Sequence, residues 1–117
     1  MKQINTYTPH GIPANARIAV DNLTSSRSGE AVRNQFAIRV WGTIRFQSYK
    51  TTCLIWDYQQ TVLTVFPAAF NYSRTTSKYA KRFLIEECGF TPEEVKEIRK
   101  IEKTADYSED CPLFIKW

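Results

Sequence analysis

Residues 35–66 constrain the fold most, because apolar side chains recur there at alternate positions and predict β-strands. Two alternating runs flank Gly42, with apolar positions at Phe36, Ile38, Val40, Ile44 and Phe46. Alternation on both sides of a glycine predicts a hairpin, whose corner is either Trp41-Gly42 or Gly42-Thr43. These five apolar residues are expected to share one face. The opposite face is then expected to carry Arg39, Arg45, Gln47 and Tyr49.

Two further strands are predicted after this hairpin. Residues 52–56 and 61–66 are nearly continuous in β-branched, aliphatic and aromatic side chains, which is typical of central strands. Pro67 ends the second of them, since proline cannot donate to a strand ladder. Residues 35–66 therefore predict an antiparallel β-meander, and the sheet expected is a meander of three to five strands.

The apolar period then changes to a helical one, and a helix pair is expected over residues 75–104. Thr75 or Thr76 is a suitable N-cap for the first helix. Gly89 and Phe90 have the pattern of a Schellman ending. Thr91-Pro92-Glu93-Glu94 has the pattern of a capping box with proline at the first helical position. The second helix is expected to run from Pro92 to about Lys103.

The fold class expected is a single α+β domain over residues 1–117, with the two α-helices packed on one face of the sheet. Residues 1–16, with two prolines and a glycine, predict an extended arm, and residues 21–34 predict a mobile loop. The apolar segment 110–117 is expected to dock as an edge strand or to clamp the core.

Composition argues against an enzyme, a metal site or a cofactor. The single histidine, His10, lies between Pro9 and Gly11 and is more typical of a surface residue than of a general base. Cys53, Cys88 and Cys111 lack the paired spacings of a zinc site or a disulfide framework, so reduced thiols are expected, with a Cys88–Cys111 bridge left open. The start of the chain has no apolar signal segment and no long apolar run follows, which predicts a cytoplasmic protein without membrane contact.

The charge is unevenly distributed along the chain. Residues 1–85 contain eleven Lys and Arg against three Asp and Glu, whereas residues 86–117 contain five against nine. A basic body favours a polyanionic partner, and basic residues interleaved with aromatics at a helix start can hold phosphates. The candidate partner- or phosphate-binding residues are Arg39, Arg45, Tyr49, Tyr72, Arg74, Lys78, Lys81 and Arg82. The alternative is that these cations are simply solvated and the tyrosines belong to the core.

Three segments together carry a resemblance: Asn34-Gln35-Phe36, Phe46-Gln47-Ser48-Tyr49, and Tyr72-Ser73-x-Thr75-Thr76-x-Lys78-Tyr79 followed by Phe83-Leu84. The chain resembles a group of small phage and mobile-element proteins, a family of unknown function with a W-D-Y-S-x-T-T-x-K-Y…F-L block. Phe70-Asn71 stands here where Trp-Asp is commoner. The group has no catalytic residues to carry over, and its setting includes anti-CRISPR and other anti-defence inhibitors.

The function expected from this resemblance is non-catalytic inhibition of a host defence complex, as an anti-CRISPR protein that binds an effector and blocks it sterically in the host cytoplasm. Its partner would be a host defence protein or ribonucleoprotein, with contact to nucleic acid and a homodimer both left open. The first alternative is a small nucleic-acid-binding or regulatory module of a phage. The second is a phage structural or assembly protein.

Overall fold

Across residues 1–25 and 27–117, which the structure describes, seven strands form one antiparallel sheet. This computed structural model orders them β1-β7-β6-β5-β4-β3-β2. The strands are β1 Lys2–Ile4, β2 Ile18–Thr24, β3 Ala31–Val40, β4 Thr43–Ser48, β5 Thr51–Asp57, β6 Val62–Val65 and β7 Leu113–Lys116. The α+β class is confirmed, but the expected three to five strands understate the sheet.

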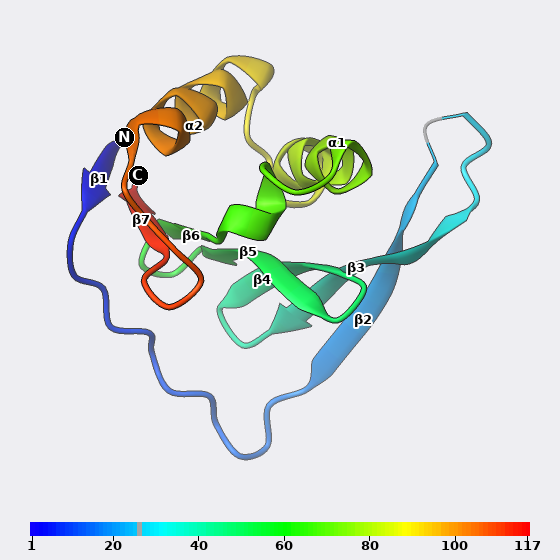
Figure 1. Ribbon diagram of the computed structural model, residues 1–117. Coiled ribbons are helices and arrows are strands. Elements are labelled where there is room, and N and C mark those ends of the chain that lie inside the picture. Colours follow the sequence, from blue (N-terminus) through cyan, green and yellow to red (C-terminus); the bar gives the residue numbers. More distant parts are fainter. Residues whose placement is uncertain (26) are drawn as a thin grey trace.

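Both helices lie on the same side of the sheet, and the chain that follows β1 crosses the other side (Figure 1). The helical elements are η1 Pro67–Ala69, α1 Arg74–Arg82, η2 Phe83–Glu87 and α2 Pro92–Thr104. The N-cap of helix α1 is Ser73, two or three residues before the expected Thr75 or Thr76, because the Ser73 side chain accepts the hydrogen bond from the Thr76 N–H. The capping box at the start of α2 forms as predicted, with Thr91 and Glu94 bonding reciprocally.

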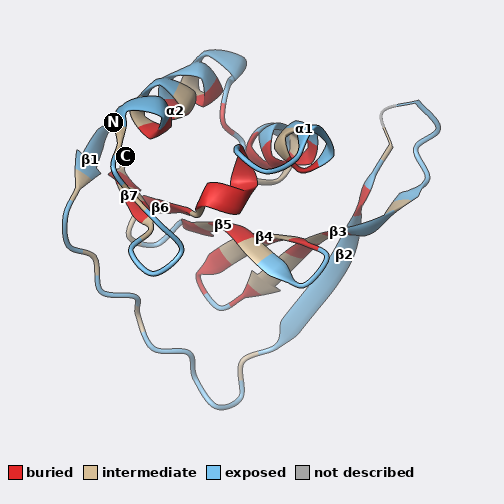
Figure 2. Cartoon of the chain, viewed as in Figure 1, coloured by how far each residue is buried: buried red, intermediate tan, exposed pale blue. Residues whose placement is uncertain are grey.

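The core lies between the sheet and the helices (Figure 2). One row of cross-strand partners is almost completely buried, and it consists of Ala37, Phe46, Leu54, Val65 and Leu113. Phe83 of η2 covers this row, with its ring centroid 5.7 Å from that of Phe46. A second aromatic group closes the other end of the core, where the Phe90 ring lies 4.8 Å from Trp56 and 4.3 Å from Trp117.

The predicted faces of the first hairpin are wrong. Trp41-Gly42 forms a two-residue corner that pairs Val40 with Thr43, so Ile38 lies opposite Arg45 and Ala37 opposite Phe46. Even-numbered residues of β3 therefore share a face with odd-numbered residues of β4. As a result Arg39 and Arg45 lie on opposite faces of the sheet.

The prediction of a loop over residues 21–34 is also wrong for most of that range. Residues 21–24 continue β2, residues 31–34 begin β3, and the two strands pair with a register shift between Asn22 and Thr24. Ser26, which fell in that expected loop, lies outside the described residues. Polar composition misled the prediction, because β2 is an edge strand whose side chains are mostly exposed.

The two ends of the chain form paired strands. Part of the expected arm, Lys2–Ile4, is the edge strand β1, and it pairs with β7. The tail therefore does not dock as an edge strand: β7 lies between β1 and β6, with Leu113 and Ile115 buried. Among the described helices, none is long and apolar enough to cross a membrane.

Candidate polyanion-binding surface

The start of α1 presents a stripe of cations to solvent. Ser73 caps the helix, and Arg74, Lys78 and Lys81 follow at positions that share one helical side. These residues and the preceding turn line a shallow hollow, which is formed by Phe70, Asn71, Tyr72, Ser73, Arg74, Ser77, Lys78 and Lys81. The Lys78 ammonium lies 5.4 Å from the centroid of the Tyr79 ring, at cation–π distance.

A second stripe of cations lies on α2. Lys96, Arg99, Lys100 and Lys103 are spaced i, i+3, i+4 and i+7, so they share one side of the helix. With Lys81 of α1 they line an open groove of about 580 Å³, whose remaining lining residues are Ile85, Pro92 and Val95. Because Lys81 lines both hollows, the two stripes form one continuous surface. We name it the cationic helical surface, and its members are Arg74, Lys78, Lys81, Lys96, Arg99, Lys100 and Lys103.

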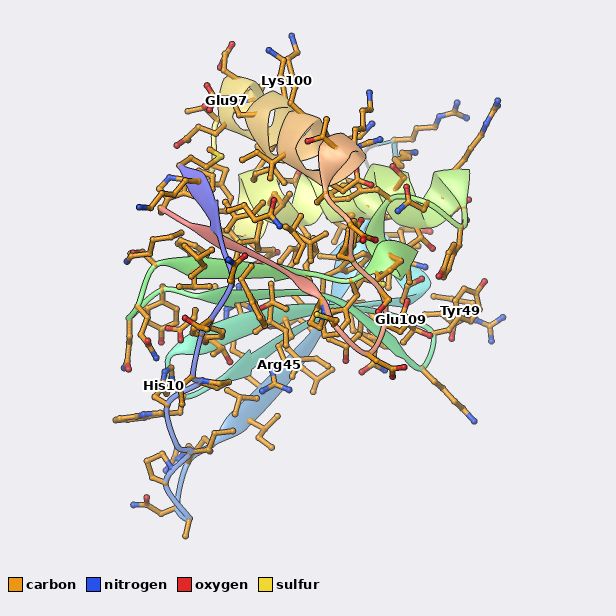
Figure 3. The ribbon with its side chains drawn as sticks, turned by 60° about the vertical axis from the view of Figure 1, so that its left-hand side comes forward. His10, Arg45, Tyr49, Glu97, Lys100 and Glu109 are labelled. Atoms are coloured by element: carbon orange, nitrogen blue, oxygen red, sulfur yellow. The ribbon has the colours of Figure 1, made fainter. Side chains whose placement is uncertain are left out.

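Few acidic side chains neutralise the cations of this surface. Within the described part of the chain, Arg99 is its one member in an ion pair, at 3.5 Å from Glu102 Oε2. The Arg99 guanidinium also stacks on Phe70, with 4.6 Å between Cζ and the ring centroid. The acidic residues Glu93 and Glu97 of α2 lie outside the groove lining. Figure 3 shows Glu97 and Lys100 at the outer side of α2, away from the sheet. Uncompensated cations in one concave surface produce a positive potential that attracts an anionic partner.

Half of the predicted binding residues fall in this region. Tyr72, Arg74, Lys78 and Lys81 line the hollow at the start of α1. Arg82 does not: it pairs with Glu86 and donates to the Thr24 carbonyl, which ties α1 to β2.

The other three predicted residues are scattered. Arg39 lies on the helix-facing side of the sheet, where Asp21 and Glu87 neutralise it. Arg45 is on the opposite face (Figure 3). Tyr49 is exposed in the turn after β4, at a φ of 56°. The shared strand face expected for Arg39, Arg45 and Tyr49 does not exist.

Sequence reasoning missed the four cations of α2. The acidic total of residues 86–117 hid them, although the spacing of Lys96, Arg99, Lys100 and Lys103 is visible in the sequence. A charge count by helical side, rather than by chain segment, would have found them.

The single histidine has a structural environment that composition did not indicate. His10 Nδ1 lies 3.2 Å from Oδ2 of the buried Asp57, and Nε2 lies 2.9 Å from the Trp41 carbonyl oxygen. The Tyr7 hydroxyl donates to the same Asp57 oxygen, and burial together with this bond raises the pKa of Tyr7 well above its usual value. Both ring nitrogens of His10 therefore face protein acceptors. This arrangement fixes the segment after β1 to the sheet, whereas a general base needs one nitrogen facing a substrate.

A metal site is not evident either. Among the described residues, no three or more His, Cys, Asp or Glu side chains gather closely enough to hold an ion. The three thiols are free: Cys53 is buried, Cys88 is partly buried and Cys111 is exposed.

The fold and this surface define an α+β protein with a seven-stranded antiparallel sheet and a cationic helix pair. The chain matches the family of unknown function DUF8033 over residues 18–103 and belongs to that family. No curated protein and no solved structure matches the chain significantly.

Proposed function

We propose that this protein is a non-catalytic binding protein whose cationic helical surface docks on the nucleic acid of a nucleoprotein complex. The leading candidate for that complex is a host defence effector, and the protein would then be a phage or mobile-element inhibitor of the anti-CRISPR kind. One observation carries the proposal: seven Lys and Arg side chains gather on one side of the helix pair, with a single ion pair among them in the described chain.

The physical argument rests on the cost of keeping like charges together. Seven cations over two short helices repel one another, and a partner that supplies phosphates removes this repulsion while releasing counterions. The apolar groove residues Ile85, Pro92 and Val95 would add contact area beneath the charged side chains. The resemblance to small phage proteins supports the choice of a defence complex.

The test is charge reversal with a matched control. Lys81→Glu/Lys100→Glu reverses two groove cations, whereas Arg33→Glu/Lys50→Glu makes the same charge change at exposed residues outside the groove. Cleavage by a panel of CRISPR effectors, each loaded with guide RNA, is measured with each variant added. We expect the wild type and the control to inhibit a susceptible effector, and the groove variant to lose at least about tenfold in potency.

A second candidate is an autonomous nucleic-acid-binding module, which the same cations favour. Tight binding of bare duplex DNA or guide RNA in a mobility-shift assay, with no effect on any effector, would select this candidate. Equal inhibition by the groove variant and the wild type would reject the cationic helical surface as the inhibitory site.

A further inference from the structure

The face of the sheet opposite the helices holds a partly open cavity of about 250 Å³. The segment after β1 covers it from outside, held by the Tyr7 bond to Asp57 and by the Gln60 side chain, which donates to the Thr8 carbonyl. Its apolar walls are Pro9, Ile12, Ile55, Phe66, Pro112 and Phe114. This volume is below the range of about 300–1,000 Å³ typical of drug-sized ligands, so it suits a smaller molecule.

One cation projects into these apolar surroundings. The strand register places Ile38, Arg45, Ile55, Thr64 and Phe114 in a single row across the sheet, and Arg45 is the charged member of that row. Figure 3 shows Arg45 on the side of the sheet away from α2, near His10. The sheet therefore brings a guanidinium to the wall of an otherwise mainly apolar cavity.

In the part of the chain that the structure describes, nothing pairs with the Arg45 guanidinium. Its Nε is buried there without a hydrogen-bond acceptor, and Arg45 forms no ion pair with a described residue. A buried donor without an acceptor is costly, and native structures retain one mainly where something else satisfies it. The buried carboxylate on the neighbouring strand β5 is already occupied, because Asp57 accepts from Tyr7 and from the N–H groups of Gln59 and Gln60.

We propose that this cavity binds a small molecule with one carboxylate on an apolar body, such as a medium-chain or aryl-alkyl acid. The carboxylate would accept hydrogen bonds from the Arg45 guanidinium, which presents its donors in a planar fork that matches a carboxylate. The apolar body would lie against Ile55, Phe66 and Phe114. Apart from Arg45, the polar residues that line the cavity are Tyr7, His10, Thr43 and Thr64. The Tyr7 hydroxyl and both His10 nitrogens already face Asp57 or the Trp41 carbonyl. The Thr43 hydroxyl donates to the Val40 carbonyl. Arg45 and the Thr64 hydroxyl therefore remain to donate to a ligand, and this set suits a monoanion better than a phosphate dianion. This site is separate from the cationic helical surface and does not depend on the proposed function.

The probes are octanoate and 3-phenylpropanoate, with octan-1-ol as the uncharged match, all titrated by calorimetry against the full chain. We expect at least one acid to bind saturably and octan-1-ol to bind at least about tenfold more weakly. Arg45→Met keeps an unbranched stem but removes the guanidinium and its charge, and it should lose about tenfold or more in acid affinity. Lys81→Glu/Lys100→Glu, at the other surface, should bind the acids as the wild type does.

A second measurement uses the wild type alone and stands even if Arg45→Met fails to fold. The ¹⁵N–¹H signal of Arg45 Nε should shift on addition of the bound acid, since that group gains an acceptor. The proposal is overturned if neither acid binds, if octan-1-ol binds as tightly as the acids, or if the Arg45 Nε signal stays unchanged at saturation.

Discussion

At the scale of single residues, the hydroxyl-rich segment at the start of α1 is mainly a structural device. The Ser73 side chain caps the helix, and Thr76 is buried against the sheet, with its Oγ1 3.1 Å from Ser48 Oγ. Ser48 in turn accepts from the Gln35 amide at 3.0 Å. Three segments that are far apart in the sequence, around Gln35, Ser48 and Thr76, therefore touch one another. Their side chains fix α1 on the sheet and so set the position of its cations.

Gly89 gives the first residue-scale prediction. It has a φ of +82°, and a Cβ built there would meet nothing within 4 Å. A Cβ atom at this position therefore meets no clash, and the main expected cost of substitution is backbone strain. Gly89→Val should lower the free energy of unfolding by about 1 kcal/mol or more, because a β-branched residue resists positive φ. Gly89→Asn, which tolerates this conformation better, should lose less, and an equal loss in both variants would contradict the strain account.

The three cysteine thiols give the second residue-scale prediction. Burial raises the pKa of the Cys53 thiol to about 11 and raises that of Cys88 further still, whereas Cys111 is exposed. The thiolate is the reactive form, and at pH 8 a thiol with this pKa is ionised to only about one part in a thousand. A disulfide reagent should therefore modify one thiol quickly in the folded protein and the other two only after denaturation. Cys111→Ser should remove the fast phase; a persistent fast phase would place the reactive thiol elsewhere.

At the scale of the elements, the capping box fixes where α2 begins and hence where its cations lie. Glu94 accepts from the Thr91 N–H at 2.9 Å and from the Trp117 indole at 3.1 Å. The Thr91 N–H is the main cause that lowers the pKa of Glu94, with the Trp117 indole adding to it. The carboxylate thus links the helix start to the residue that follows β7.

The pH dependence of this link follows from the direction of the shift. A lowered pKa in the folded state means that the stabilisation is present above the ordinary carboxyl pKa and is lost as the pH falls through the folded value. Glu94→Ala should therefore have a lower melting temperature than the wild type at pH 7. This difference in melting temperature should narrow towards about pH 3. Glu93→Ala, which changes a residue outside the capping box, should lower the melting temperature at pH 7 by less than Glu94→Ala does. A Glu94→Ala difference that persists unchanged at low pH would refute the role of the charge.

The helices and strands could be predicted from the sequence better than the way in which they pair and pack. The β-meander, the end of the first helical segment at Gly89 and the start of α2 follow from local signals that the structure confirms. The pairing of β1 with β7 could not be predicted in this way, because strands of three and four residues from opposite ends of the chain leave no local pattern. The faces of the first hairpin depended on a corner that the sequence left open between two positions. That corner decides on which side Arg45 emerges, so the expected grouping of Arg39, Arg45 and Tyr49 on one face was wrong. The cations at the start of α1 do lie together, because helical spacing alone places them; that they bind a partner stays a prediction.

At the scale of the whole molecule, the sheet separates two surfaces of different chemistry. The helix side carries the cationic helical surface, and the opposite side carries the cavity with Arg45 (Figure 3). The acidic total of the last third does not describe a surface, because the cations of α2 face the same groove as Lys81 of α1. The fold, rather than the net charge of each stretch of the sequence, therefore decides where positive charge gathers on the surface.

The salt dependence of binding tests the cationic helical surface most directly. The affinity for a fluorescent 20-base-pair DNA duplex, which we expect to be weak but measurable at low salt, is recorded over a series of salt concentrations for three proteins. For the wild type, the logarithm of the affinity should fall linearly with the logarithm of the salt concentration, by about 0.9 per phosphate neutralised. Lys81→Gln/Lys100→Gln should reduce the magnitude of that slope by about one to two, whereas Arg33→Gln/Lys50→Gln should leave it unchanged. Equal slopes for the groove variant and the wild type would contradict the claim that these helices hold phosphates.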